Sequence, residues 1–270
     1  MRSRSRRSIL PPLSDDEALE AARIASAVGA PVEPVALGRR RPFRAPHHTI
    51  STAGLVGGGV PPRPGEATIA HRGVLFLDEL PEFNRDALEA LRQPLEAGRV
   101  LIARARHRVE LPCRFQLVAA ANPCPCGRGA SSGDCTCPPQ AVARYEAKLT
   151  GALSDRLDLA IAVEQPDLTA LADERPEDSA TVRERVIAAR ERQEARNGGR
   201  ANAEVPSESI VLGPGLQRLL ADRGGALGLS GRGRARVIRV ARTIADLDGA
   251  EEVGEEHLLE ALHLRRRHER

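Results

Sequence analysis

Aromatic residues are scarce in this sequence. Phe, Trp and Tyr together make up 2% of the 270 residues, with no Trp and a single Tyr. Stacking surfaces for unpaired nucleobases are therefore poorly supplied. No apolar run approaches the roughly 20 residues that a membrane span needs, and no apolar segment follows the basic start of the chain. We expect a cytoplasmic protein that has no membrane partner.

Lysine is nearly absent, since Lys148 is the only one. A phosphate-binding Walker A loop needs Gly-x-x-x-x-Gly-Lys-Ser/Thr, and Lys148 is followed by Leu149. These residues therefore contain no Walker A loop. The net charge of +3 is too small to predict a nucleic-acid partner by itself. A hydrophobic fraction of 41% with 29% charged residues is typical of a globular protein of one large or two modest domains.

The segment from Gly73 to Leu80 carries the clearest chemical signal. Four large apolar residues run directly into the carboxylates Asp78 and Glu79. Such a run is typical of a central strand in a parallel sheet, and α/β folds bind ligands at the carboxyl ends of their strands. We interpret it as a Walker B element, in which Asp78 holds Mg²⁺ through its waters and Glu79 polarises the attacking water. The alternative is a strand that ends in a solvated acidic turn.

Other patterns predict an α/β core that surrounds this strand. Ser14 and Glu17 form a capping box at a helix start, and Asn84 caps a helix that ends at Gly98. A hairpin over residues 100–111, a helix around 140–149, and buried strands over 115–122 and 158–163 complete the list of expected elements. Short buried strands separated by helices indicate an α/β sheet.

The pattern changes near Pro166. Helical spacing, with no strand candidate, continues over residues 179–196, 213–223, 232–246 and 255–267. We therefore expect two domains, an α/β core over residues 1–165 and a small all-α domain over residues 166–270.

Four of the five cysteines cluster between residues 124 and 137. Cys124, Cys126, Cys135 and Cys137 offer four thiolates, which can hold a structural Zn²⁺ tetrahedrally. The spacing Cys-x-Cys is less usual than Cys-x-x-Cys, so reduced structural thiols remain the alternative. Cys113 stands apart, and its place at a strand start predicts burial.

Two adjacent histidines lie in the extended segment over residues 41–51. On a strand, His47 and His48 face opposite sides and do not chelate one metal, so a packing or interface role is expected. A glycine-rich tip follows at residues 54–65, and no Gly-Lys-Ser/Thr comes after its glycines.

Several motifs together resemble a known family. GVLFLDELPEF, LVAAANPCPCG, LSDRLDL and SGRGRARVIRVARTIADL follow one another in this order, and RPFRAPHHTIS precedes them. They resemble the ComM/YifB group of AAA+ ATPases, which is related to the ChlI ATPase subunit of magnesium chelatase. The resemblance runs from about Ile9 to the end of the chain. It implies an AAA+ P-loop NTPase-type parallel sheet, a helical lid, and ATP and Mg²⁺ as cofactors.

The resemblance also implies residue roles. Asn122 matches sensor 1, which orients the lytic water and contacts the nucleotide. Arg156 matches the arginine finger that reaches the γ-phosphate of a neighbouring subunit, and Arg232 matches the sensor-2 arginine of the lid. Phosphoryl transfer needs positioning and positive charge around the γ-phosphate, so this set of groups suits it.

Two insertions match DNA-facing parts of the family. The loop at Gly57–Gly65, with Arg63, matches the helix-2 insert, and the hairpin tip matches the pre-sensor-1 hairpin. In related hexameric motors both project into a central pore through which DNA would pass. The implied DNA-binding residues are Arg63, Arg104, Arg106, His107 and Arg108, and the implied partners are DNA and further copies of this chain in a homo-hexamer.

Three functions follow as hypotheses. The first is a DNA-directed motor that couples ATP hydrolysis to branch migration in recombination or transformation. The second is a chelatase-like ATPase that remodels a protein partner, and the third is a non-catalytic remnant that binds partners or zinc.

Family members place Gly-Lys-Thr just before a helix that ends in an ILPPLS-like stretch, similar to Ile9–Ser14. We therefore expect an N-terminally truncated form, without the P-loop and the preceding Lon-protease-like domain.

Overall fold

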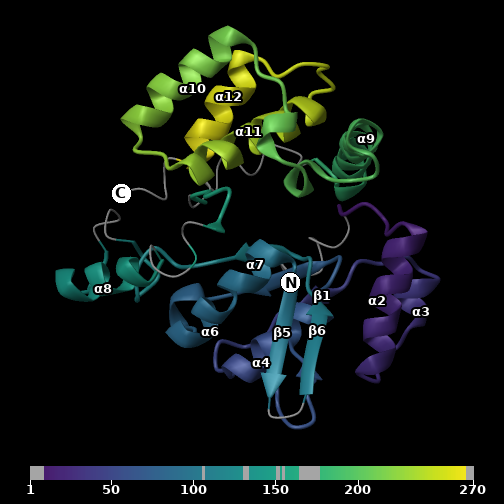
Figure 1. The fold of residues 1–270 in the computed structure, drawn as a ribbon. Helices are drawn as coiled ribbons and strands as arrows, with labels where there is room; N and C mark the ends of the chain where they lie inside the picture. The colour runs from purple at the N-terminus through teal and green to yellow at the C-terminus, as the bar shows by residue number, and fades with distance from the viewer. Residues whose placement is uncertain are drawn as a thin grey trace. The chain divides into compact units, whose positions relative to one another are not determined.

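The computed structural model describes residues 9–104, 107–129, 134–149, 153, 156–163 and 177–265. Internal contacts divide the chain into two compact units (Figure 1). The sheet unit comprises Pro12–Arg156, and the helical unit comprises Leu157–Arg270 with Met1–Pro11. The boundary predicted near Pro166 lies outside the described residues. Within the described ranges, no helix combines the length and apolar composition that crossing a bilayer requires.

A three-stranded parallel sheet forms the centre of the sheet unit, in the order β1-β4-β7. The strands are β1 (Phe43–Arg44), β4 (Val74–Leu77) and β7 (Gln116–Ala119). Val74 pairs with both Phe43 and Gln116, so β4 is the middle strand. Leu75 and Leu77 of β4 are fully buried because the strand has a neighbour on each side and helices around it. The prediction of a central buried parallel strand is confirmed.

The strand predicted over residues 158–163 is wrong. Ile161 and Val163 are 70% and 89% exposed, and no strand covers this segment. Its backbone bonds to a helix end instead, since Ala160 N–H donates to Leu264 O at 3.0 Å. An apolar alternation becomes a strand only where a partner strand offers its free backbone groups. The third strand of the sheet is β1, from the segment that the sequence indicated only as extended.

Helices pack around the sheet. They are α2 (Asp15–Ala27), α3 (Glu33–Ala36), α4 (Thr52–Val56), α5 (Glu66–Ile69), η1 (Leu80–Glu82), α6 (Arg85–Ala90), α7 (Arg92–Ala97) and α8 (Pro139–Leu149). The capping box of α2 is confirmed: Ser14 Oγ accepts from Glu17 N–H and Glu17 Oε2 accepts from Ser14 N–H, both at 3.3 Å. The helix around residues 140–149 is confirmed as α8.

The helix predicted over residues 86–97 is divided into α6 and α7. Asn84 caps it, with Oδ1 accepting from Asp86 N–H at 2.8 Å, and Gly98 ends it in the left-handed conformation, as predicted. The helix breaks at Leu91 because Pro94 has no N–H for the carbonyl of Ala90, four residues earlier.

Two antiparallel hairpins extend from the sheet unit. One pairs β5 (Arg99–Arg104) with β6 (His107–Pro112), which confirms the predicted hairpin. The other pairs β2 (Gly57–Gly58) with β3 (Arg63–Pro64) at the glycine-rich segment. The hairpins contact each other, since a Cβ on Gly57 would come within 2.9 Å of Ile102 Cδ1. Only glycine fits at this contact, where its φ is +104°.

One apolar cluster surrounds the central strand of the sheet unit. It joins β4 to α4, to α6 and to the inner face of the β5–β6 hairpin, through Leu55, Leu75, Leu91 and Ile102. Cys113 belongs to the same cluster and is buried, as predicted. The cluster holds the start of β4 and the hairpin base together, so the polar ends of the strands project from a fixed core.

The helical unit contains the four predicted helices and, among its described residues, no strand. They are α9 (Ser179–Asn197), α10 (Pro214–Ala226), α11 (Gly231–Leu247) and α12 (Glu255–Arg265), with short turns η5 (Asn202–Glu204) and η6 (Ser207–Ser209). Residues 266 and 267 of the last predicted helix lie outside the described residues. Val237, Ala241 and Ala245 of α11 pack against Leu258 and Leu262 of α12 to form the core.

A buried ion-pair network ties α9 to α11. Asp246 is 0% exposed, and its carboxylate accepts from both Arg196 Nη atoms, at 2.9 and 2.7 Å. Arg242 Nη2 and Asn202 Nδ2 donate to the same carboxylate at 3.0 and 2.8 Å. A carboxylate buried this deeply is stable only with such a complete set of donors.

Candidate functional site

Two carboxylates stand at the carboxyl end of the central strand. Asp78 and Glu79 follow β4 directly and are both exposed, whereas Leu77 and Leu80 on either side are buried. Glu79 adopts a left-handed backbone conformation with φ of 54°, and its N–H donates to Asp78 Oδ1 at 3.1 Å. The chain therefore turns sharply after the strand and presents both carboxylates to solvent. Carboxylate oxygens in this position suit a hydrated Mg²⁺.

Asn122 follows the neighbouring strand. Leu80 N–H donates to Ala120 O, and Ala120 N–H donates to Leu77 O, both at 2.9 Å. These bonds continue the β4–β7 pairing past the strand ends and join the loop that carries Asp78 and Glu79 to the loop that carries Asn122. The exposed amide of Asn122 thus lies at the same edge of the sheet as the two carboxylates.

His48 reaches this edge from the segment that follows β1. Its Nδ1 lies 3.2 Å from Oε2 of Glu79, and its ring contacts those of His47 and Phe83, with centroid distances of 4.1 and 6.4 Å. The prediction that His47 and His48 face opposite sides is wrong. The strand ends at Arg44 and the backbone turns at His48, which brings the two rings together.

Arg156 lies within the sheet unit and is held by α7. Its Nη2 donates to Oε1 of Glu96 at 2.8 Å, and its side chain is only 10% exposed. Among the described residues, no acceptor lies within hydrogen-bond distance of its buried Nε. Arg156 is therefore engaged inside its own subunit in the described conformation.

Arg232 lies in the helical unit, in the first turn of α11. Ser230 caps this helix, with Oγ accepting from Gly233 N–H at 3.1 Å, and Arg232 is exposed beside the cap. The cap fixes the backbone of this turn, so Arg232 projects from a rigid helix start.

Basic residues lie on both hairpins of the sheet unit. Arg63 on β3 and Arg108 on β6 are exposed. Arg106 and the side chains of Arg104 and His107 lie outside the described residues. Because the β2–β3 and β5–β6 hairpins contact each other at Gly57 and Ile102, the structure brings together two segments that the sequence placed far apart.

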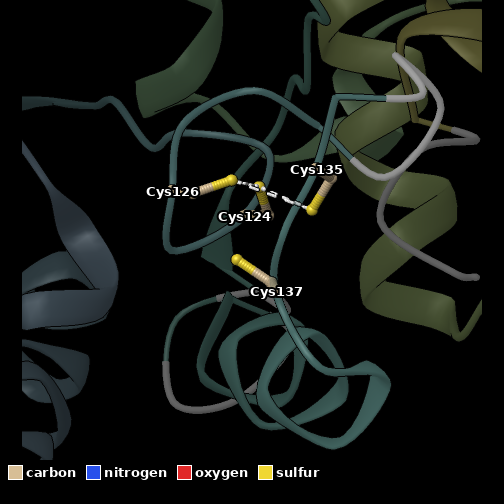
Figure 2. Close-up of side chains that lie close together, drawn as sticks. All are labelled: Cys124, Cys126, Cys135 and Cys137. Carbon is tan, nitrogen blue, oxygen red and sulfur yellow. Dashed lines mark hydrogen bonds between the residues drawn. The ribbon is translucent and has the colours of Figure 1, made fainter.

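Four cysteines converge in the connection between β7 and α8. The ligand atoms of Cys124, Cys126, Cys135 and Cys137 all lie within 4.8 Å of one another. Figure 2 shows the four sulfurs pointing toward a common centre from two passes of the chain. The hydrogen bond from the backbone N–H of Arg128 contributes most to lowering the pKa of Cys126, to about 6. In contrast, burial raises the pKa of the isolated Cys113 thiol to about 12.

Comparison with known proteins identifies the family. The family model described as "Magnesium chelatase, subunit ChlI" matches residues 1–171. The chain belongs to this family. The model described as "Magnesium chelatase, subunit ChlI C-terminal" matches residues 176–265, which contain α9 to α12. A parallel sheet with helices, followed by a helical C-terminal region, is consistent with an AAA+-like fold.

Three relatives share most of this chain. It is 44% identical over 263 residues to the uncharacterized protein YifB of Salmonella typhimurium and 45% identical over 264 residues to YifB of Escherichia coli. It is 45% identical over 261 residues to the competence protein ComM of Haemophilus influenzae. These alignments cover 94–95% of this chain and 50–51% of the relatives. The chain therefore spans about half the length of the curated relatives it matches.

Helix α8 places two residues at the sheet edge that carries Asp78, Glu79 and Asn122, which the sequence did not indicate. Lys148, the only lysine, donates from Nζ to Pro81 O at 2.9 Å, two residues after Glu79. Tyr145 is buried, which raises its pKa, and the backbone of Asn122 hydrogen-bonds to it. Helical periodicity placed both residues on α8 but carried no sign that α8 crosses the ends of β4 and β7.

Proposed function

We propose that this chain is part of an AAA+ ATPase that uses ATP hydrolysis to remodel DNA. The observation that carries the proposal is the placement of Asp78 and Glu79 at the end of the central strand. Asn122 stands at the same edge, after the neighbouring strand. Phosphoryl transfer depends on positioning and electrostatics, which carboxylates and an amide on rigid strand ends supply.

The residues present fit Mg²⁺ and ATP. Asp78 offers an exposed carboxylate of the kind that holds Mg²⁺ through its waters, and Glu79 is available to accept a proton from an attacking water. Asn122 would orient that water, and Arg232 would contact the nucleotide from the lid. The bound Mg²⁺ would neutralise charge on the phosphates. Lys148 does not serve as a phosphate-binding lysine, because its Nζ donates a hydrogen bond to the carbonyl oxygen of Pro81.

DNA is the proposed substrate. The exposed Arg63 and Arg108 lie on adjoining hairpins, and phosphate contacts from arginines supply much of the affinity for DNA. The family resemblance implies the same role for Arg104, Arg106 and His107. Similarity to the competence protein ComM supports this choice, while the match to the magnesium chelatase models keeps a protein-remodelling activity as the second candidate.

A homo-oligomer, which we propose to be a hexamer, would complete the site. Arg156 would act on the nucleotide of a neighbouring subunit, for which the bond to Glu96 must open. Mixing subunits tests this role. Arg156→Ala and Glu79→Gln proteins are each expected to be inactive, and their mixture is expected to recover part of the hydrolysis rate. A mixture as inactive as its components would contradict a role in a neighbouring site.

The central experiment measures ATP hydrolysis with and without branched DNA. It uses this chain and a form extended to the length of the relatives. Each is measured unchanged, as the Glu79→Gln variant, and as the Glu89→Gln variant, which serves as a surface control. Hydrolysis that branched DNA stimulates and Glu79→Gln abolishes supports the motor. Hydrolysis indifferent to DNA favours the chelatase-like activity, and no hydrolysis in either form rejects both.

We also propose that Cys124, Cys126, Cys135 and Cys137 bind one Zn²⁺. Thiolate sulfurs are ligands that Zn²⁺ prefers, and four of them close its coordination shell, which makes a structural rather than a catalytic site. The alternative is a set of reduced thiols without metal.

A further inference from the structure

We infer that zinc in the four-cysteine cluster holds α8 across the carboxyl edge of the sheet and thereby fixes the loops that carry Asp78, Glu79 and Asn122. This inference rests on the zinc site proposed above but not on nucleotide hydrolysis or DNA binding. It concerns only residues of the sheet unit.

The spacing of the sulfurs fits zinc. Four sulfurs at Zn–S bonds of about 2.3 Å in a tetrahedron are separated by about 3.8 Å. Cys124 Sγ lies 3.3 Å from Cys126 Sγ and 3.7 Å from Cys135 Sγ, and the last two are 3.8 Å apart. A disulfide requires about 2.05 Å, so none of these three pairs is bonded. Reduced thiols spaced this way leave room for an ion at their centre.

The backbone around Cys124 is shaped to support a thiolate. Gly129 N–H donates to Cys124 Sγ at 3.2 Å, and Gly127 N–H donates to Cys124 O at 2.9 Å. Gly129 has a φ of +86°, which favours glycine at the position whose N–H faces the sulfur. In metal sites, hydrogen bonds such as these hold the ligand atoms in the orientation that the ion requires.

The connection that carries the cysteines has little else to order it. It runs from the end of β7 at Ala119 to the start of α8 at Pro139, and its described residues form neither helix nor strand. Cys124 is fully buried, while Pro125, Cys126 and Arg128 around it are exposed. A polar segment without an apolar core gains order from metal binding, since the binding free energy then becomes folding free energy.

The cluster stands between the two ends of that connection. Cys124 comes two residues after Asn122, and Cys137 comes two residues before α8. One ion bound to both passes of the chain would therefore fix the end of β7 relative to the first turn of α8. The remainder of α8 then reaches back to the sheet edge.

Two residues of α8 make that contact. Tyr145 is buried and hydrogen-bonds to the backbone of Asn122, and Lys148 Nζ donates to Pro81 O at 2.9 Å, three residues after Asp78. Helix α8 thus braces the loops that follow β4 and β7 at the same time. Loss of the ion would release the start of this helix and loosen both loops.

The test measures zinc content and the mobility of α8 in the full chain. Protein purified with zinc in the medium is analysed by mass spectrometry for metal, and amide hydrogen exchange is followed with and without a zinc chelator. We expect about one zinc per chain. We also expect chelation to increase exchange at least tenfold in α8 and in residues 116–122, with no change in α11 of the helical unit.

Variants distinguish the cluster from other thiols. Cys135→Ser is expected to lose the zinc and to show the fast exchange of chelated protein, whereas Cys113→Ala removes a cysteine outside the cluster and keeps the zinc. If Cys135→Ser does not fold, chelation of zinc from the unchanged chain tests the same effect on exchange. Less than a fifth of a zinc per chain rejects the metal site, and zinc whose removal leaves α8 exchange unchanged rejects the bracing role. Neither result depends on ATPase activity.

Discussion

His48 Nδ1 lies 3.2 Å from Oε2 of Glu79, although 31 residues separate the two in the chain. The contact exists because β1 and β4 are parallel neighbours, so the residues beyond their carboxyl ends meet. His48 is also packed against His47 and Phe83, which restrains its ring. The carboxylate proposed to act on the attacking water is therefore oriented by a residue from the segment that follows the adjacent strand.

Removing this contact is expected to slow hydrolysis without weakening nucleotide binding. In a form of the relatives' length, His48→Ala should lower kcat by roughly tenfold or more, because a misplaced catalytic group is costly. KM for ATP should stay within about twofold, since the phosphates are not bound by His48. Steady-state kinetics, with His263→Ala on the surface of α12 as control, measure both constants. Equal kcat for His48→Ala and the control would show that the contact does not position Glu79.

Charge removal on the hairpins is expected to weaken DNA binding in a salt-dependent way. Arg63→Ala and Arg108→Ala should each reduce the slope of log affinity against log salt by about 1, because each arginine would neutralise one phosphate. Fluorescence anisotropy with branched DNA over a salt series gives the slope. Arg85→Ala removes an exposed arginine of α6 and should leave it unchanged. If all three variants show the same slope of log affinity against log salt, the hairpins are excluded as the DNA surface.

Acid is expected to destabilise the sheet unit through His71. This residue is 2% exposed, its Nδ1 accepts from Arg114 N–H at 3.0 Å, and its Nε2 lies 3.1 Å from Glu20 Oε2. Burial lowers the pKa of His71, so the unfolded chain takes up this proton before the folded one does. The free energy of unfolding should therefore fall as the pH drops from about 6.5 toward the lower folded pKa.

Urea unfolding between pH 5 and 8 tests this dependence. Tyr145 is the only Tyr and the chain has no Trp, so intrinsic fluorescence reports the sheet unit alone. His71→Gln should flatten the fall in stability below about pH 6.5, whereas the exposed His263→Gln should not. If the free energy of unfolding depends on pH in the same way for His71→Gln and the unchanged chain, His71 is not the cause of the acid destabilisation.

Neutralising Asp246 is expected to destabilise the helical unit strongly. Asp246→Asn leaves Arg196 and Arg242 without their shared carboxylate, and breaking a buried ion pair on one side costs about 3–5 kcal/mol. Denaturation followed by circular dichroism measures the free energy of unfolding. Asp222→Asn makes the same change at an exposed position of α10 and should cost less than about 0.5 kcal/mol. A loss below 1 kcal/mol for Asp246→Asn would show that the network contributes little.

Local sequence signals were sufficient for the elements whose causes are local. The capping box at Ser14, the Asn84 cap, the four helices of the helical unit and the apolar run of β4 were all predicted and are confirmed. The same signals failed where contacts with other segments of the chain determine the secondary structure. Residues 158–163 have the composition of a strand, but no strand of the described ranges pairs with them. Pro94 broke a helix whose periodicity was continuous.

The sequence by itself determined the kinds of groups at the site: two carboxylates after a buried strand, an amide after the next, and four clustered cysteines. Only the tertiary structure decided which groups meet. Parallel pairing of β1 with β4 brings His48 to Glu79, and the turn of the chain after β7 brings Lys148 to Pro81 and closes the four sulfurs around one centre. The physical reason is that strand pairing and helix packing join residues distant in the chain. The chemistry of each side chain is given by the local sequence, but such contacts form only when the whole core folds.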